Sequence, residues 1–160
     1  MEEQRDTSFF RFEDLRIYDK SLEYYSWLIS QVKSADEFAK KALFMPFLDS
    51  AAKISLNIAD GTSYHKSQFV NYLKYAKANV RQCVVFTTMA QQNGFFTDEQ
   101  TEQSRNTLIE MTKMLGAMVV SLQKRTNKRQ EDSLQSDDTI KDDTPVSNSS
   151  DSDFNLNFNY

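Results

Sequence analysis

Apolar side chains recur through residues 9–129 at intervals of three and four positions, which places them on one face of a helix. Four such stripes follow one another, and short polar segments separate them. Their members are Leu15, Tyr18, Leu22, Tyr25, Ile29 and Val32; Leu43, Phe47, Ala51, Ile54 and Ile58; Phe69, Leu73, Ala76, Val80, Cys83, Thr87 and Ala90; and Leu108, Met111, Leu115, Met118 and Leu122. Four amphipathic helices with short connections predict an all-α fold, an antiparallel up-down four-helix bundle.

Residues that begin or end helices flank these stripes. Ser34-Ala35-Asp36-Glu37 and Thr97-Asp98-Glu99-Gln100 both have the form of a capping box, which begins a helix. Gly61 and Asn93-Gly94 are expected just past the ends of the second and third helices. Pro46 lies inside the second stripe, and we expect it to kink or restart that helix.

The formal net charge of −4 conceals two unlike parts of the chain. Residues 1–130 contain 18 Lys and Arg against 15 Asp and Glu, whereas residues 131–160 contain one Lys against eight acids. The second part is rich in Ser, Asp and Asn and buries too little apolar surface to offset its chain entropy. We therefore expect a flexible N-terminus at residues 1–8, the bundle at residues 9–129 and a disordered acidic tail at residues 130–160.

The composition excludes several classes of protein. Only 3 Gly and 2 Pro leave too few turn residues for a hairpin-rich all-β fold. No apolar run approaches the ~18 residues of a membrane span, and the polar start of the chain lacks the pattern of a signal peptide. One Cys and one His permit neither an internal disulfide nor most triad and metal chemistry. We expect a cytoplasmic protein that is not an enzyme and holds no metal or cofactor.

The third helix carries the most distinctive surface. No Asp or Glu occurs between Thr62 and Thr97, and the basic residues there are Lys66, Lys74, Lys77 and Arg81. At 100° per residue these four fall within an arc of about 80° that is separate from the apolar stripe. Aligned cations without acids are typical of a surface that binds phosphate backbones. An ordinary solvated face, or one paired with acids of a neighbouring helix, is the alternative.

Large aromatic residues occur off the apolar stripes as well. Tyr72, Tyr75 and Phe86 lie on the other flank of the third helix, and Tyr24 and Trp27 lie off the stripe of the first. Because monomers rarely expose such patches, these five residues predict an interface between copies of the chain. Local packing under a loop is the alternative.

Isolated polar residues have structural interpretations. Asn57 and Asp60 are expected to finish the second helix beside Gly61 with side-chain hydrogen bonds, although a ligand or partner site stays open. His65 is expected to be exposed in the first turn of the third helix. Cys83 falls on an apolar stripe, which predicts an inert buried thiol.

The end of the chain has a pattern of its own. Apolar residues alternate with Asn in the last seven positions, at Phe154, Leu156, Phe158 and Tyr160. Alternation at period two is strand-like and gives one apolar edge, which is suited to docking on a partner or in a groove. Two alternatives remain, a disordered end and an acidic arm that folds back on the basic stripe.

Four segments resemble a known family. They are Phe12-Glu13-Asp14-Leu15, Asn57-Ile58-Ala59-Asp60-Gly61, Gln68-Phe69-Val70-Asn71-Tyr72-Leu73 and Asn93-Gly94-Phe95-Phe96-Thr97. In these segments the chain resembles the bacterial four-helix-bundle proteins encoded in intervening sequences of 23S rRNA genes. The resemblance covers roughly Phe9 to Lys124. The family usually has Pro where this chain has Ser55, and basic residues near the positions of Leu48 and Asp49.

The resemblance implies a four-helix bundle that assembles as a ring-like homopentamer. It also implies kinship with the accessory variability determinant of diversity-generating retroelements, a bundle that binds RNA and a reverse transcriptase. The family has no established enzymatic activity. Together with the basic stripe, this predicts a non-catalytic oligomeric scaffold or adaptor that binds RNA or DNA non-specifically. The alternative is a protein–protein interaction module that acts through exposed aromatics and the C-terminal tail.

Overall fold

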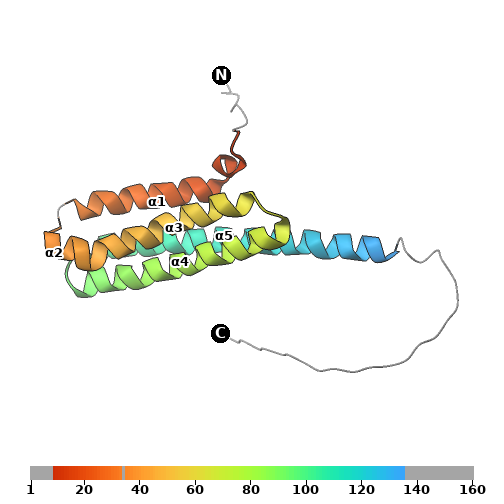
Figure 1. Cartoon of the computed structure of the whole chain (residues 1–160). Helices are drawn as coiled ribbons and strands as arrows, with labels where there is room; N and C mark the ends of the chain where they lie inside the picture. The colour runs from red at the N-terminus through yellow and green to blue at the C-terminus, as the bar shows by residue number, and fades with distance from the viewer. Residues whose placement is uncertain (1–8, 34, 136–160) are drawn as a thin grey trace, which may run out of the picture.

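The computed structural model of the chain describes residues 9–33 and 35–135, and within these ranges it is helical with no strand (Figure 1). The four long helices are α1 (Arg16–Val32), α3 (Met45–Thr62), α4 (Lys66–Gln92) and α5 (Asp98–Gln135). A 3₁₀ turn, η1 (Arg11–Asp14), precedes α1, and the short α2 (Glu37–Ala39) and the π-helical η2 (Lys40–Phe44) precede α3. The predicted all-α class is confirmed.

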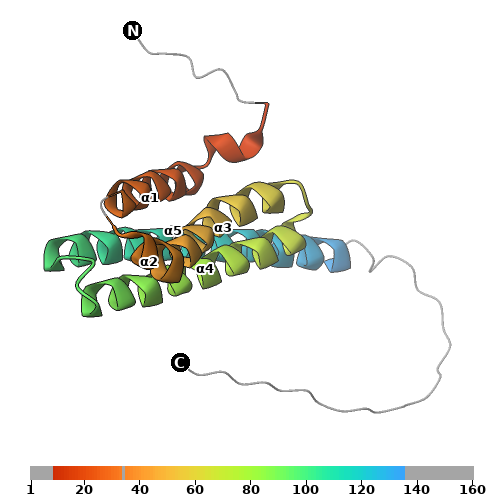
Figure 2. The ribbon, with the colours of Figure 1, turned by 60° about the vertical axis from the view of Figure 1, so that its left-hand side comes forward.

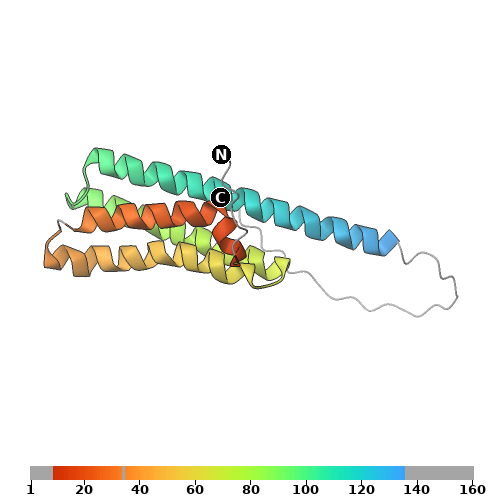
Figure 3. The same ribbon diagram turned by 90° about the horizontal axis from the view of Figure 1, so that it is seen from above.

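The long helices form an antiparallel up-down bundle. α1 packs on α3 and α5, and α4 packs on the same two helices from the other side (Figures 1 and 2). α5 continues past the end of its neighbours to Gln135 (Figure 3), beyond Arg129 where the sequence analysis places the end of the bundle. The predicted N-terminal segment 1–8 and most of the predicted acidic tail, residues 136–160, lie outside the described residues.

The helix boundaries follow mostly from local hydrogen bonds. Thr97 Oγ1 accepts from the backbone N–H of Gln100, and the Gln100 side chain accepts from the N–H of Thr97, which is the predicted capping box. At the other predicted box the cap is Asp36, whose carboxylate accepts from Ala39 N–H at 2.7 Å, while Ser34 lies outside the described residues. Gly94 ends α4 with a φ of 73°, in the left-handed region that Gly tolerates best.

Pro46 restarts the second helix, as predicted. A proline has no N–H to donate to the carbonyl four residues earlier, so a regular α-helix cannot run through it unchanged. The chain widens into the π-turn of Lys40–Phe44, in which Met45 N–H reaches the carbonyl of Lys40, and α3 begins with Pro46 in its first turn. The wider π-turn accommodates Pro46, so that α2, η2 and α3 follow one another as a nearly continuous helical segment.

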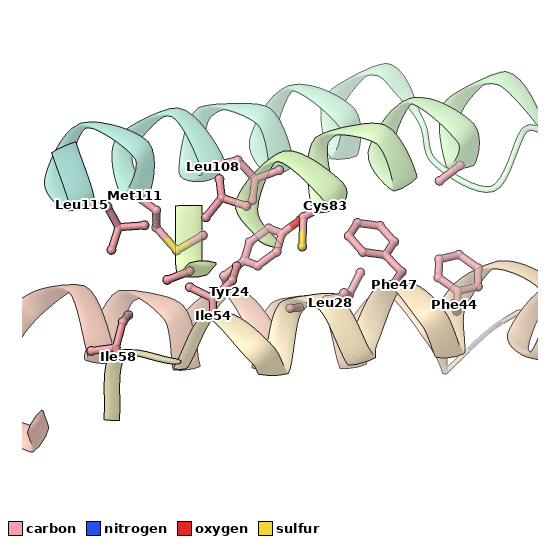
Figure 4. Packing of buried hydrophobic residues seen from close by; sticks show 14 of the residues in the cluster. Tyr24, Leu28, Phe44, Phe47, Ile54, Ile58, Cys83, Leu108, Met111 and Leu115 are labelled. Carbon is pink, nitrogen blue, oxygen red and sulfur yellow. The ribbon is translucent and has the colours of Figure 1, made fainter. Parts of the chain in front are cut away.

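The core runs along the axis of the bundle (Figure 4). The predicted stripes of the second, third and fourth helices supply most of it, including Phe47, Ile54, Leu73 and Leu108, each fully buried. The predicted stripe of the first helix is only partly right, since Leu15, Tyr18, Tyr25 and Val32 lie at the edge of the core while a neighbouring face of α1 is fully buried. Its buried residues are Ile17, Ser21, Tyr24 and Leu28, whereas Leu22 and Ile29 of the predicted stripe are exposed.

A chain of hydroxyl groups explains why α1 turns this face inward. Tyr24 Oη lies 2.9 Å from Ser104 Oγ of α5, and Ser104 Oγ lies 2.7 Å from Thr87 Oγ1 of α4. Thr87 donates its hydrogen to the carbonyl of Cys83 at 2.8 Å. Each hydroxyl has one hydrogen, so Ser104 donates to Thr87 and Tyr24 donates to Ser104. All these groups are buried and satisfied, which ties α1, α4 and α5 together.

Gly61 has a different role from the one expected. It lies inside α3 and is buried, and α3 ends one residue later. A Cβ built on Gly61 would lie 2.7 Å from Phe69 Cδ2 and 2.7 Å from Tyr72 Cβ, both on α4. Gly61 is therefore required because the α4 side chains approach the α3 backbone so closely.

Replacing Gly61 with Ala is expected to push α3 and α4 apart and to destabilise the fold by about 1–3 kcal/mol, the usual cost of overpacking. The matched control is Gly116→Ala in α5, where an added Cβ meets nothing within 4 Å. That change removes a flexible residue from a helix interior and should stabilise the protein by about 0.5–1 kcal/mol. Urea unfolding measures both. Equal effects of the two substitutions would contradict the close approach of α3 and α4.

Replacing Tyr24 with Phe removes the first donor of the hydroxyl chain, and Ser104 Oγ loses the hydrogen bond that it accepts from Tyr24. The free energy of unfolding is expected to fall by about 1–3 kcal/mol. Tyr25→Phe is the control, because Tyr25 is only half-buried and none of the described hydrogen bonds uses its hydroxyl. An equally small change for both variants, measured by urea unfolding, would show that the hydroxyl chain contributes nothing to stability.

Candidate nucleic-acid interface

The predicted basic residues lie along one flank of α4. Lys74, Lys77 and Arg81 are exposed, and Lys66 is half-buried at the start of the helix. Lys74, Arg81 and Thr88 follow one another at seven-residue intervals, close to two helical turns, so they form a line along α4. At the end of that line Thr88 Oγ1 accepts a hydrogen bond from Arg105 Nη1 of α5 at 3.2 Å. The flank therefore borders α5.

α5 adds basic charge to this border. Arg105 is exposed and held over α4 by its contact with Thr88. From Gln103 to Gln130 the only acid is Glu110. Glu110 faces the opposite side of α5, where it pairs with Lys20 of α1 at 2.9 Å and, through that hydrogen bond, raises the pKa of Lys20. We call Lys66, Lys74, Lys77 and Arg81 together with Arg105 the basic flank.

Sequence reasoning missed Arg105. The signal was present, since the fourth helix also has a long acid-poor part, with Glu110 as the one acid between Gln103 and Gln130. Only the packing of α5 against α4 shows that the two acid-poor runs meet.

None of the ion pairs among the described residues involves the basic flank. The ion pairs of the described residues join Lys20 to Glu23 and Glu110, Lys40 to Glu37, and Lys53 to Asp49. All of them lie away from the basic flank, on α1, on the segment from α2 through α3, or between α1 and α5. The predicted alternative, pairing with acids of a neighbouring helix, thus finds no support among the described residues. The basic flank keeps its positive charge facing solvent.

Most of the predicted interface aromatics are used within the bundle. Tyr24 is a core residue at 2% exposure and offers no surface to a second copy, so the expectation that it lies off the core is wrong. Trp27 stacks on Tyr24 and meets Phe96 edge-on, each at a ring distance of 5.7 Å, and Phe86 stacks on Phe47 at 5.4 Å. For these residues local packing is what the structure shows.

The tyrosines at the start of α4 form a smaller exposed cluster. Tyr72 is half-buried and stacks on Tyr64 at 5.1 Å, and Tyr75 meets Tyr72 edge-on at 6.0 Å. Tyr75 remains 57% exposed. Of the predicted interface residues, Tyr75 is exposed, whereas Tyr72, Trp27 and Phe86 are half-buried.

A second apolar surface, absent from the sequence-based prediction, lies between α1 and α3. The residues that line a groove there are Ala52, Ser55, Leu56 and Ala59 of α3, Tyr18, Leu22 and Tyr25 of α1, and Phe12 of η1. Leu22 is 41% exposed and Leu56 is 57% exposed. No charged residue lines the groove. It follows from the rotation of α1, which leaves Leu22 of the predicted core stripe beside solvent.

The residues of the turn after α3 act structurally. Asn57 donates from its side chain to the carbonyl of Lys53, inside its own helix. The hydroxyls of Thr62 and Ser63 donate to the carbonyls of Ala59 and Asp60 and thereby finish the helix, in place of the Asn57 and Asp60 side chains expected to do so.

The candidates for chemistry lie apart from one another. His65 is exposed and is the cap residue that begins α4. Cys83 is fully buried, and this burial raises the pKa of its thiol to about 12, so it is not a reactive thiolate near neutral pH. Within the described ranges no group of three His, Cys, Asp or Glu residues is arranged to hold a metal ion.

Comparison with known proteins agrees with this architecture. Residues 13–117 match the family model of the 23S rRNA-intervening sequence proteins, which is more than half of the chain. The chain belongs to the 23S rRNA-intervening sequence protein family. No curated protein matches it significantly.

A protein known from a crystal structure shares the fold of this chain. It is a protein of unknown function from the S23 ribosomal protein family, from Bacteroides thetaiotaomicron, and it is 22% identical to this chain with a TM-score of 0.60. The match covers 64% of this chain and 94% of that one. The family match includes all of α1, α3 and α4 and most of α5. None of the described helices has a stretch long and apolar enough to cross a membrane.

Proposed function

We propose that this 23S rRNA-intervening sequence protein is a non-catalytic, cytoplasmic scaffold that binds RNA or DNA non-specifically through the basic flank. The observation that carries the proposal is the arrangement of Lys74, Lys77, Arg81 and Arg105 on adjoining helices, exposed and without a partner carboxylate among the described residues. Such a surface attracts phosphates and releases their counterions on binding.

The geometry favours backbone contacts over base recognition. Lys66 and Arg81 are fifteen residues apart on α4, which is about 22 Å along the helix. This length spans several phosphates of a nucleic-acid strand, since DNA carries one charge per ~3.4 Å of each strand. The exposed aromatic Tyr75 lies on the other flank of α4, away from the cations, so stacking on bases is not supported. We infer binding that is indifferent to sequence.

Assembly of several copies would strengthen a weak single site. Four or five cations on one protomer give modest affinity, and repetition around a closed ring multiplies it through effective concentration. We propose that copies meet through the cluster of Tyr64, Tyr72 and Tyr75, in which two of the predicted interface residues, Tyr72 and Tyr75, lie beside the exposed Tyr64. The family resemblance implies five copies.

One observation favours a second candidate function, that of a protein-interaction module. The apolar groove between α1 and α3 is open and uncharged, and such grooves accept apolar segments of other chains. A protein partner such as a reverse transcriptase, which the resemblance implies, would then bind without any role for the basic flank.

A salt titration of nucleic-acid binding tests the proposal. If Lys74, Lys77, Arg81 and Arg105 each neutralise one phosphate, the logarithm of affinity for duplex DNA should fall with the logarithm of salt concentration at a slope of about −3.6 per protomer. Replacing Lys77 with Gln should make the slope shallower by about one. Fluorescence anisotropy with a labelled duplex and a labelled single-stranded RNA measures both.

Lys53→Gln is the matched control for this experiment. It removes the same charge from an exposed lysine, but Lys53 lies on α3 and pairs with Asp49 at 2.6 Å. Its slope should equal that of the unaltered protein. Equal effects of Lys77→Gln and Lys53→Gln would mean that net charge alone drives binding, and no binding at low salt would overturn the proposed function.

A further inference from the structure

The apolar groove between α1 and α3 has the surface of a binding site. Its lining includes the small residues Ala52, Ser55 and Ala59 of α3 and two exposed leucines, Leu22 of α1 and Leu56 of α3. The groove has a volume of about 350 Å³. From Ala52 to Ala59 it runs for about 10 Å along α3. Exposed leucines beside small side chains suit the burial of bulky apolar groups.

The chain itself carries a segment of matching chemistry. Residues 154–160 read Phe-Asn-Leu-Asn-Phe-Asn-Tyr and contain no charged side chain, like the groove. In an extended chain alternate residues lie about 6.8 Å apart on the same side. Two successive members of the set Phe154, Leu156, Phe158 and Tyr160 therefore fit the length of the groove.

The connecting chain is long enough to reach. Lys20 of α1 pairs with Glu110 of α5, which places the α1 side of the groove, around Tyr18 and Leu22, at the level of Glu110. Gln135 is 25 residues farther along α5, about 37 Å away along the helix axis. The 18 residues from 136 to 153 span up to about 60 Å when extended. This exceeds the axial distance and leaves enough chain to cross to the α1–α3 side.

The charges of the connecting chain and of α5 favour a path back along the bundle toward the groove. Residues 136–153 contain six Asp and one Lys, and mutual repulsion extends a chain of like charges. On the way back this segment would pass the end of α5, where Lys124, Arg125 and Lys128 are exposed. Opposite charges along the path lower the cost of holding the segment against the bundle.

We propose that residues 154–160 bind in the groove between α1 and α3 of the same chain, with their apolar side chains against Leu22 and Leu56. The groove is then the docking site of an internal ligand. A partner protein that uses the groove must first displace this segment.

Paramagnetic broadening in the full-length protein tests the proposal. A nitroxide is attached through Ser152→Cys, and Cys83 does not compete because it is fully buried with a raised thiol pKa. The amide signals of Leu22, Leu56 and Ala59 should disappear with the oxidised label and return when ascorbate reduces it. In the same labelled protein, changing Phe154, Leu156, Phe158 and Tyr160 to Ser should abolish this loss.

Other outcomes overturn the proposal. Broadening centred on Lys74, Lys77 and Arg81 would mean that the acids dock on the basic flank instead. A further sample mixes spin-labelled chains without ¹⁵N with ¹⁵N-labelled chains that carry no nitroxide. Broadening of Leu22 and Leu56 in that mixture would show that the segment enters a second copy. No broadening in any sample would show that the groove does not bind the segment.

Discussion

The hydrogen bonds from Tyr24 to Ser104 and from Ser104 to Thr87 determine how α1 sits against the rest of the bundle. α1 has two apolar faces, and on hydrophobicity alone the face with Leu15, Leu22 and Ile29 is the better core. Burying a tyrosine requires a partner for its hydroxyl, because an unsatisfied buried hydroxyl costs about 1–3 kcal/mol. Ser104 and Thr87 supply hydrogen-bond partners for the face of α1 that carries Tyr24. On the same face Ser21 Oγ lies 2.9 Å from Ser55 Oγ of α3.

This choice of face shapes the surface. Once Tyr24 is inside, Leu22 and Ile29 lie outward, and Leu22 lines the apolar groove together with Leu56 of α3. On the opposite side, the contacts of Thr87 and Thr88 with α5 and the close approach of Phe69 to Gly61 fix the rotation of α4. The same rotation directs the line of Lys74 and Arg81 to solvent beside α5. The apolar groove and the basic flank thus lie on different sides of one bundle.

Much of this architecture is predictable from sequence because it depends on local patterns. The capping box at Thr97 and Gln100, the turn at Gly94 and the restart at Pro46 each involve residues a few positions apart. The rotation of α1 could not be predicted in this way, since Tyr24 and Ser104 are 80 residues apart and Ser21 and Ser55 are 34 apart. The sequence predicts a helix end at Gly61 because the approach of Phe69 has no sequence signal. The cations of α4 were found from composition, whereas adding Arg105 required the packing of α5.

The central functional claim is that phosphate contacts concentrate on the border between α4 and α5. Chemical-shift mapping of the full-length ¹⁵N-labelled protein with a short single-stranded RNA, at low salt, tests it most directly. The account predicts that the amides of Lys74, Lys77, Arg81 and Arg105 shift together with RNA concentration and return toward their original positions when salt is added. Shifts confined to the groove residues Leu22 and Leu56, or no shifts at all, would contradict it.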